Sequence, residues 1–298
     1  MDLSHLLTEQ QRPELADLDL KSTAELVELM VVDQGKALAE VETGAAAIAA
    51  AIDAIVGQLE LGGRLIYVGA GTAGRLGLLD AAECPPTFTT DRVIGLIAGG
   101  SDAFLVSKEA VEDDASAGAA DIESHEVGES DAVVGLTASG RTPYTIGAMT
   151  RARESRAVTV GVTCNPDSEL SKHVDHVIEV VVGPEVIAGS TRLKAGTAQK
   201  VVLNMISTIS MVRMGKTFGN LMVDLKATNE KLRDRARRIV VQATGASPEE
   251  ADQALAQADG EVKVAILLLI TGWGAETARR QLTKHKGRVR AALEERND

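Results

Sequence analysis

The feature that most constrains the fold is an alternation of short apolar runs with helix-forming sequence. Five such runs, rich in valine, isoleucine and leucine, lie at 65–68, 93–98, 132–136, 158–163 and 177–182. Continuous apolar runs of this length are typical of strands buried on both faces of a parallel sheet. Their alternation with helical or loop-plus-helix sequence predicts an α/β fold, a doubly wound, flavodoxin-like five-stranded parallel sheet covered by helices on both faces.

The first predicted strand runs into a glycine-rich turn, Gly69-Ala70-Gly71-Thr72-Ala73-Gly74. Small residues let the backbone approach a phosphate, and the N–H groups and dipole of a helix N-terminus favour its charge. Gly71 and Thr72 are therefore predicted to bind an anion. Residues 75–82 are expected to be helical. The helix is expected to stop at Glu83-Cys84-Pro85-Pro86, because proline has no N–H to donate.

Two further loops that follow strands are rich in hydrogen-bond donors. For the loop after the third strand, an N-cap with a solvated arginine is the alternative reading. Ligands of open α/β sheets bind beyond the carboxyl ends of the strands, and a monophosphate offers three acceptor oxygens. Three such loops at one sheet edge therefore predict a sugar-phosphate pocket. The predicted contacts in these two loops are Ser139, Gly140, Arg141, Thr142, Ser190, Thr191 and Lys194.

Two glutamates are candidates for acid–base chemistry. Glu83 follows the helix of the glycine-rich turn, and Glu112 lies in the acidic, helix-like segment Glu109-Ala110-Val111-Glu112-Asp113-Asp114 after the second strand. A cap or a solvated helix face would explain either residue alone. Both lie in segments that leave the same sheet edge, and two carboxylates beside a sugar can divide the roles of acid and base. The acid is expected to be buried, since burial raises a carboxyl pKa.

Nucleotide and metal sites are not favoured. GAGTAG matches G-x-G-x-x-G, but a dinucleotide site needs an acidic residue at the end of the second strand to bind the ribose. That strand ends in Leu96-Ile97-Ala98-Gly99-Gly100, with Asp102 arriving only later, and the motif lacks a P-loop lysine. His173-Val174-Asp175-His176 precedes a strand without further ligands nearby, so no metal site is predicted.

Composition narrows the classes of partner. The 298 residues carry a formal net charge of -12, which argues against nucleic acid as a general partner. Cys84 and Cys164, the two cysteines, form no spaced motif, which suits a reducing cytoplasm. The N-terminus lacks a basic start followed by an apolar core, so no signal peptide is expected. No apolar run reaches the roughly 18 residues of a membrane span, so no membrane partner is expected.

Helical sequence flanks the strand region on both sides. Helices are predicted over about 36–59, 194–214 and 226–244, and Ser22 and Ser247 begin patterns typical of a capping box. We therefore expect three parts: an N-terminal arm and helices (1–54), a phosphosugar-binding catalytic domain with trailing helices (55–245) and a small helical, UBA-like domain (246–298).

Five stretches of the chain together resemble the N-acetylmuramic acid 6-phosphate etherase family. They are GRLIYVGAGTAGRLGLLDAAECPPTF, GLIAGG, ASGRTPY, GSTRLKAGTAQK and FGNLMVDLKATNEKL. The resemblance covers nearly the whole chain and implies the sugar isomerase (SIS) fold. The chain is also similar to the glucokinase regulatory protein of animals, which binds sugar phosphates without turnover.

The resemblance implies a lyase of peptidoglycan recycling that converts N-acetylmuramic acid 6-phosphate to N-acetylglucosamine 6-phosphate and D-lactate. It implies no metal or cofactor, a cytoplasmic location and a homodimer with sites near the subunit interface. By position, Glu83 matches the family's acid in AECPPTF, and Glu112 matches the second catalytic glutamate. Two departures are visible. Ala73 stands where the family usually has serine, which removes a possible phosphate hydroxyl, and Ala110-Val111 replaces Gly-Ala without changing the spacing.

The expected chemistry is elimination of the lactyl group followed by addition of water, with one acid and one base at each step. Two other classes stay open. A non-catalytic sugar-phosphate sensor would bind the same ligands, and an aldose–ketose isomerase would also remove a proton α to a carbonyl. Release of D-lactate separates the three.

Overall fold

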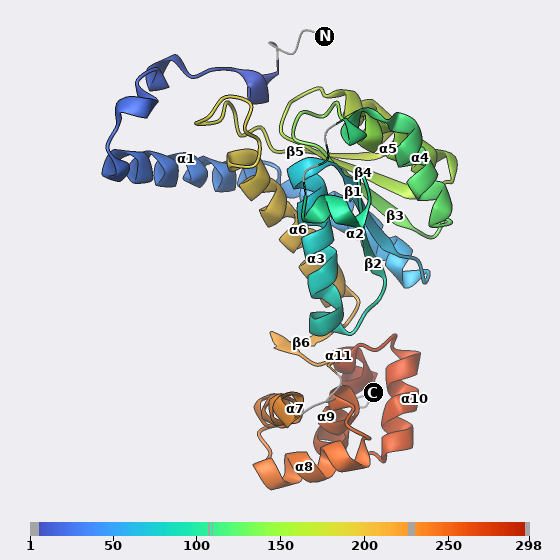
Figure 1. The fold of residues 1–298 in the computed structure, drawn as a ribbon. Helices are drawn as coiled ribbons and strands as arrows, with labels where there is room; N and C mark the ends of the chain where they lie inside the picture. The colour runs from blue at the N-terminus through green and yellow to red at the C-terminus, as the bar shows by residue number, and fades with distance from the viewer. Residues whose placement is uncertain (1–5, 107, 109, 226–229, 296–298) are drawn as a thin grey trace. The chain divides into compact units, whose positions relative to one another are not determined.

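The computed structural model describes residues 6–106, 108, 110–225 and 230–295 (Figure 1). Contacts divide the chain into two compact units, Met1–Ala82 with Arg92–Ser207, and Glu83–Asp91 with Thr208–Asp298. The chain passes between them inside two helices, α3 (Gly71–Phe88) and α6 (Lys194–Arg213). The three-part division expected from the sequence, with boundaries at 54/55 and 245/246, stays a prediction about separate domains.

The first unit is built on a five-stranded sheet. Its strands are β1 (Leu65–Gly69), β2 (Val93–Ile97), β3 (Ala132–Leu136), β4 (Val158–Thr163) and β5 (His176–Glu179). All neighbouring strands run parallel, in the order β2-β1-β3-β4-β5. This confirms the predicted flavodoxin-like sheet. The order in which successive strands are added to the sheet reverses between β1 and β3, and ligands of such sheets bind outside the carboxyl ends of the strands at that point.

Helices pack on the sheet as the alternation predicts. α5 packs against α4 and against β1, β3 and β4, whereas α2 packs against β3, β4 and β5. Figure 1 shows α4 and α5 on one side of the sheet and α3 on the other. The other helices of this unit are α1 (Thr23–Thr43), α2 (Ala45–Glu60), α4 (Ala115–Ser124), α5 (Pro143–Glu154), and the 3₁₀ helices η1 (Leu7–Glu9), η2 (Pro13–Leu15), η3 (Leu18–Leu20), η4 (Ser101–Phe104), η5 (Val111–Asp113) and η6 (Glu169–His173).

Glycines let α3 approach the sheet closely. A Cβ at Gly74 would lie 2.6 Å from the Gly69 carbonyl oxygen, and one at Gly77 would lie 2.9 Å from Tyr67 Cβ. Any side chain at either position would push the helix away from β1. Packing therefore requires these glycines, and it holds the N-terminus of α3 against the end of β1.

The N-terminal helical sequence differs from the prediction in one respect. The helix expected over 36–59 is two helices, α1 and α2, which meet at Gly44. The predicted capping box forms at the start of α1, where the Ser22 N–H donates to Glu25 Oε2 at 2.8 Å and the Glu25 N–H donates to Ser22 Oγ at 3.4 Å.

The predicted end of α3 is wrong. The helix continues through Pro85 and Pro86 to Phe88. The two prolines remove two N–H donors, but Thr87 Oγ1 donates to the Glu83 carbonyl at 2.8 Å and the Thr89 N–H donates to the Pro85 carbonyl at 3.0 Å. Hydrogen bonding resumes directly after the prolines, so the helix continues through them. The rule that proline ends a helix therefore fails here.

The second unit contains a small hairpin and several helices. β6 (Thr217–Phe218) pairs antiparallel with β7 (Leu221–Met222). α9 is the most buried helix, with every residue from Val262 to Leu268 buried, and the predicted capping box forms at Ser247 and Glu250. Of the helix expected over 226–244, residues 226–229 lie outside the described residues. The helices are α7 (Glu230–Thr244), α8 (Pro248–Gln257), α9 (Val262–Thr271), α10 (Ala275–Lys284) and α11 (Val289–Glu294).

Across the described ranges, no helix combines the length and the apolar character needed to span a bilayer.

Candidate functional site

A cavity of about 280 Å³ lies in the first unit, where the chain leaves β1 and β3. Its walls come from the turn between β1 and α3, the loop after β3, the start of α6, and the short η1 and η5 helices. This is the edge at which the sheet order predicts a ligand. The lining residues are Glu9, Ala70, Gly71, Thr72, Ala73, Glu112, Thr137, Ala138, Ser139, Thr142, Gly189, Thr191 and Gln199.

A cluster of hydroxyls follows β3. Thr137 Oγ1 lies 2.8 Å from Thr142 Oγ1 and 3.3 Å from Ser139 Oγ. The Gly140 N–H donates to Thr137 Oγ1 at 3.2 Å, which holds the loop in place. All three hydroxyls belong to residues that line the cavity, at the N-terminus of α5. Neutral donors beside a helix N-terminus can bind an anion without a cation.

Gln199 on α6 adds a donor to the same cavity. Its side chain is 1% exposed, and its Nε2 has no acceptor within hydrogen-bond distance among the described residues. A buried polar atom without a partner costs free energy that a ligand acceptor can recover. Gln199 therefore points to a polar ligand in this cavity.

Two carboxylates line the cavity, Glu112 and Glu9. Glu112 lies on η5, a single 3₁₀ turn, so the acidic segment is not the helix that the sequence suggests. Asp114 instead caps α4 by accepting a hydrogen bond from the Ala117 N–H at 3.0 Å. Glu109, at the start of that segment, lies outside the described residues.

Glu9 reaches the cavity because the N-terminal segment is anchored to the sheet domain. The Leu7 N–H donates to Asn165 Oδ1 at 2.8 Å, and Asn165 Nδ2 donates to Thr8 Oγ1 at 3.1 Å. The Gly189 N–H donates to the Thr8 carbonyl at 3.2 Å. This part of the predicted arm therefore forms one wall of the site.

Most of the predicted donor loops meet at this cavity. Those of the predicted site residues that line it are Gly71, Thr72, Glu112, Ser139, Thr142 and Thr191. They come from four segments that are distant in sequence, the three donor loops and η5, as the parallel-sheet argument expects. Their roles as substrate and catalytic contacts stay predictions.

Four predicted contacts do not line the cavity: Gly140, Arg141, Ser190 and Lys194. The backbone N–H groups of Gly140 and Arg141 donate to the hydroxyls of Thr137 and Ser139 and so shape the loop. The amine of Lys194 is buried, 3.2 Å from Asp33 Oδ1 and 2.8 Å from the Pro184 carbonyl oxygen.

The ion pair of Lys194 belongs to a buried network that fixes the N-terminal segment and the start of α6. Arg12 Nη1 also donates to Asp33 Oδ1, at 2.8 Å. The backbone N–H groups of Lys194 and Ala195 donate to the Glu185 carboxylate at 3.1 and 2.8 Å. Burial raises the pKa of Glu185 in spite of these two bonds.

Glu83 lies on the part of α3 that belongs to the second unit, and its side chain is exposed. The expected burial of the general acid is therefore wrong for Glu83, and Glu112 is exposed as well. That Glu83 and Glu112 act together on the same substrate bond stays a prediction.

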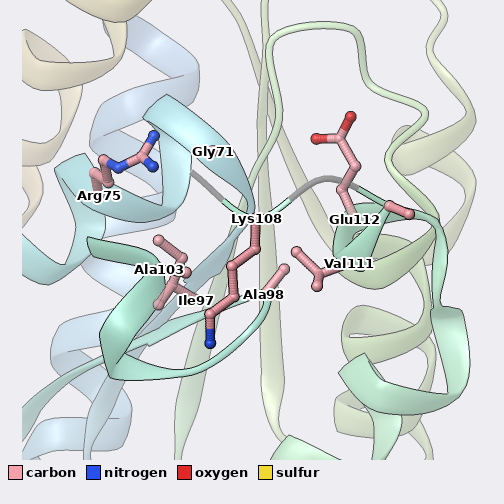
Figure 2. A pocket seen from close by; sticks show the side chains of 9 residues that line it. Gly71, Arg75, Ile97, Ala98, Ala103, Lys108, Val111 and Glu112 are labelled. Atoms are coloured by element: carbon pink, nitrogen blue, oxygen red, sulfur yellow. The ribbon is translucent and has the colours of Figure 1, made fainter. Parts of the chain in front are cut away.

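A second cavity, of about 230 Å³, adjoins the first and shares Gly71 and Glu112 with it. Figure 2 shows its walls, with Arg75 on α3 and Glu112 on η5 at opposite sides of the view. Its lining residues are Gly71, Arg75, Ile97, Ala98, Ala103, Lys108, Ala110, Val111 and Glu112.

Neither cysteine is placed for nucleophilic chemistry. Cys84 and Cys164 are both buried, and neither forms a disulfide within the described residues. Burial, together with the nearby Glu185 charge, raises the pKa of Cys164 to about 12. Within the described residues, no three or more histidine, cysteine, aspartate or glutamate side chains gather in a metal-binding arrangement.

Comparison with known proteins identifies the family. Residues 47–153 match the glucokinase regulatory protein N-terminal SIS domain, and residues 115–209 match the SIS domain. The chain is 61% identical over 295 residues to N-acetylmuramic acid 6-phosphate etherase of Rubrobacter xylanophilus, an alignment covering 98% of this chain and 97% of that protein. The chain belongs to the N-acetylmuramic acid 6-phosphate etherase family.

A second etherase, from Streptomyces avermitilis, is 55% identical over 294 residues, covering 98% of this chain and 94% of that protein. The family resemblance is therefore confirmed over the full chain. Among solved structures, a phosphoheptose isomerase from Francisella tularensis has a TM-score of 0.51 at 17% identity, over 64% of this chain and 100% of that chain. That likeness shows the shared fold.

Sequence reasoning did not single out Glu9, Thr137 or Gln199 as site residues. Thr137 directly follows the third strand, so the rule that selected Ser139 also applies to it. Gln199 lies within GSTRLKAGTAQK, a stretch that carries the etherase resemblance. Glu9 has no such signal, because its place depends on contacts with residues more than 150 positions away.

Proposed function

We propose that this protein is a carbon–oxygen lyase that cleaves the D-lactyl ether of N-acetylmuramic acid 6-phosphate. The products are N-acetylglucosamine 6-phosphate and D-lactate, and the reaction serves recycling of cell-wall amino sugars. The observation that carries the proposal is the 61% identity to an etherase over 98% of the chain. The cavity adds independent support, since hydroxyls, an unpaired amide and a carboxylate converge at the sheet edge.

The phosphate is proposed to bind at the hydroxyl loops. Thr72, Ser139 and Thr142 supply side-chain hydroxyls, and the turn at Gly71 begins a helix whose dipole favours an anion. Phosphate oxygens would accept from these groups and from Gln199 Nε2. The departure at Ala73 bears on the same group, because Ala73 lines this cavity.

The chemistry follows from the open-chain form of the substrate. The C2 hydrogen is acidic because it is α to the C1 aldehyde, and the ether oxygen is attached to C3. A base removes the C2 proton, the electron pair forms the C2–C3 double bond, and the C3–O bond breaks as an acid protonates the lactyl oxygen. Water then adds its hydroxyl to C3, and C2 regains a proton. Each acid or base contributes typically about 10²–10⁴-fold.

Two glutamates are proposed for these roles. Glu112 is assigned as the C2 base, because it lines both the phosphosugar cavity and the adjoining one. Glu83 is assigned as the acid on the lactyl oxygen and then as the base for water, on its match to the family motif. The two roles can be exchanged between them without changing the overall reaction.

The deciding experiment is incubation of the full chain with N-acetylmuramic acid 6-phosphate. D-lactate is measured with a coupled dehydrogenase, and the sugar product by mass spectrometry. We expect stoichiometric D-lactate and N-acetylglucosamine 6-phosphate. Binding without product would identify a sensor, and aldose–ketose interconversion without lactate would identify an isomerase. Either result would overturn the proposal.

We also propose a homodimer in the cytoplasm. α1 carries four exposed large apolar side chains, and three of them, Val27, Val31 and Leu38, have relative exposures of 58%, 68% and 57%. Their spacing places them on one face of the helix, which is typical of a surface that a second subunit covers. The two buried cysteines, which form no disulfide within the described residues, fit a reducing compartment.

A further inference from the structure

The two adjoining cavities differ in charge. Glu9 and Glu112 are the charged residues that line the larger cavity, and no described lysine or arginine lines it. The smaller cavity is lined by Arg75 and Lys108 beside the shared Glu112. The proposed substrate carries two anionic groups, the phosphate and the lactyl carboxylate. Neutral hydrogen-bond donors line the larger cavity and are proposed to bind the phosphate. The cationic side chains of the smaller cavity are then available to the lactyl carboxylate.

The guanidinium of Arg75 is placed so that it can bind a carboxylate. It lies four residues after Gly71 on α3, so the two residues share one face of the helix. Its Nε donates to the Phe104 carbonyl at 3.1 Å, which is the guanidinium's sole hydrogen bond within the described residues. That bond holds the plane of the guanidinium and leaves Nη1 and Nη2 to a ligand. Two parallel N–H donors match the two oxygens of a carboxylate.

Lys108 is placed differently. Its Nζ donates to the Gly99 carbonyl at 2.7 Å and lies 4.0 Å from Asp102 Oδ2. Figure 2 shows its amine directed away from Glu112. Lys108 adds positive charge to the cavity, but its amine already has partners, so Arg75 is the group with free donors.

We propose that Arg75 binds the lactyl carboxylate of the substrate through Nη1 and Nη2. This inference rests on the proposed function and adds the residue that recognises the leaving group. The phosphate at the hydroxyl loops and the carboxylate at Arg75 would stretch the substrate across both cavities. Glu112, which lines both, would then stand beside the reacting C2–C3 segment. Arg75 would also distinguish this substrate from phosphosugars that lack a lactyl group.

The test uses the full chain with Arg75→Met and Arg75→Lys. Arg75→Met should lower kcat/KM for D-lactate release by about 10- to 100-fold, because a charge-assisted bidentate contact is lost. The Kd of N-acetylglucosamine 6-phosphate, which has no lactyl group, should change by less than about twofold. Arg75→Lys keeps the charge without the planar fork, so its loss should be intermediate. Arg156→Met is the matched control, since Arg156 is exposed just before β4.

A modified substrate makes the test specific to the carboxylate. When the lactyl carboxylate is converted to a carboxamide, the kcat/KM of the wild type should fall to the value that Arg75→Met has with the normal substrate. The kcat/KM of Arg75→Met itself should change little between the two substrates. Equal weakening of N-acetylglucosamine 6-phosphate binding by Arg75→Met would overturn the inference, as would a full Arg75 effect on the carboxamide. Should Arg75→Met not fold, Arg75→Lys supplies the same comparison.

The Kd of uncleaved N-acetylmuramic acid 6-phosphate separates this inference from the proposed function. Wild-type protein that binds this compound but releases no D-lactate would refute the function. An effect of Arg75→Met on that Kd, absent for N-acetylglucosamine 6-phosphate, would still support the carboxylate contact, and no effect would refute it.

Discussion

The phosphate site proposed for this acidic protein depends on single residues, Gln199 and the hydroxyls after β3. The chain carries a net charge of -12, and carboxylates line the cavity itself. Backbone N–H groups, hydroxyls and the Gln199 amide are neutral, so they can bind a phosphate without cancelling the acidic groups that the chemistry needs. In this proposal, neutral residues of the cavity bind the phosphate, and its carboxylates are left for the acid–base chemistry.

Gln199→Leu should weaken phosphosugar binding without destabilising the fold. A hydrogen bond to a charged group contributes about 1.5–3 kcal/mol, so KM should rise at least about tenfold. The free energy of unfolding of the ligand-free protein should stay equal or rise by about 1 kcal/mol, since an unpaired buried donor is removed. Steady-state kinetics and urea unfolding measure the two quantities.

Gln58→Leu is the matched control for Gln199. Gln58 on α2 also has a buried side-chain atom, Oε1, without a hydrogen-bond partner among the described residues, and it does not line the cavity. A similar rise in KM for Gln58→Leu would contradict a ligand role for Gln199.

Glu112→Gln should lower kcat by about 10²–10⁴-fold, because it removes a proton acceptor while keeping the side-chain shape. The Kd of N-acetylglucosamine 6-phosphate should change little. Asp113→Asn removes the neighbouring exposed carboxylate and should leave kcat unchanged. Single-turnover release of D-lactate measures the effect, and an active Glu112→Gln would remove Glu112 from the mechanism.

Gly140 supports the site through its backbone. It has φ +71°, and a Cβ would lie 2.2 Å from Ser168 Cβ. Gly140→Ala should therefore lower the free energy of unfolding by about 2–4 kcal/mol, from left-handed strain plus overpacking. Gly183 has the same φ of +71° with open space around it, so Gly183→Ala should cost only about 1 kcal/mol. Equal costs in thermal unfolding would contradict the packing argument.

At the scale of elements, α3 places residues in both units. Its first turn lines the cavity, its glycines contact β1, and its last turns carry Glu83, Pro85 and Pro86. Because the helix continues past the prolines, Glu83 lies within a helix rather than in a loop. Its side-chain direction is therefore set by the phase of α3.

The starts of β1 and β3 are joined by a charged clamp. Asp131 accepts from the Arg64 backbone N–H at 2.9 Å, from Arg64 Nη2 at 2.7 Å and from the Gly128 N–H at 3.1 Å. Burial alone would raise the pKa of Asp131, but these bonds outweigh it and hold the pKa below its ordinary value. A lowered carboxyl pKa stabilises the fold above the unfolded value of about 3.9.

Asp131→Asn should therefore destabilise the protein at pH 7 by about 1.5–3 kcal/mol. The difference from wild type should begin to shrink below about pH 3.9, where the carboxyl of the unfolded chain takes up its proton, and should be lost as the pH falls through the lowered pKa of the folded protein. Urea unfolding from pH 7 to pH 3.5 measures this, with exposed Asp53→Asn as the control. A difference independent of pH would show that the charge of Asp131 contributes nothing.

At the scale of the whole molecule, the exposed apolar face of α1 is the surface on which the proposed dimer depends. A neighbouring face of this helix is buried through Asp33, Ala37 and Val41, so the exposed apolar side chains form an additional stripe beside the buried one. Such a stripe in water favours association with another apolar surface.

Val31→Lys combined with Leu38→Lys should convert a dimer to a monomer, because two charges would have to be desolvated at the interface. Ala39→Lys adds a charge at an exposed position about 100° around the helix from Leu38 and should leave the mass unchanged. Light scattering after size-exclusion chromatography measures the mass. A wild-type monomer, or a dimer that tolerates both lysines, would contradict this interface.

The sequence by itself determined the sheet and the loops that follow its strands. Strand periodicity, glycine turns and capping boxes depend on residues a few positions apart, and each was present near its predicted place, although β5 ends at Glu179 rather than at Val182. Because parallel strands share one carboxyl edge, the order of elements was enough to predict that Gly71, Ser139 and Thr191 converge.

Only the tertiary structure decided which side chains of those loops reach the cavity. Lys194 was predicted there, but its amine pairs with Asp33, and Gln199 reaches the cavity from the same helix. Helix phase and long-range packing set these directions, and no local pattern encodes them. The same reason explains Glu9, which is placed at the site because its neighbours Leu7 and Thr8 bond to Asn165 and Gly189, more than 150 positions away in the sequence.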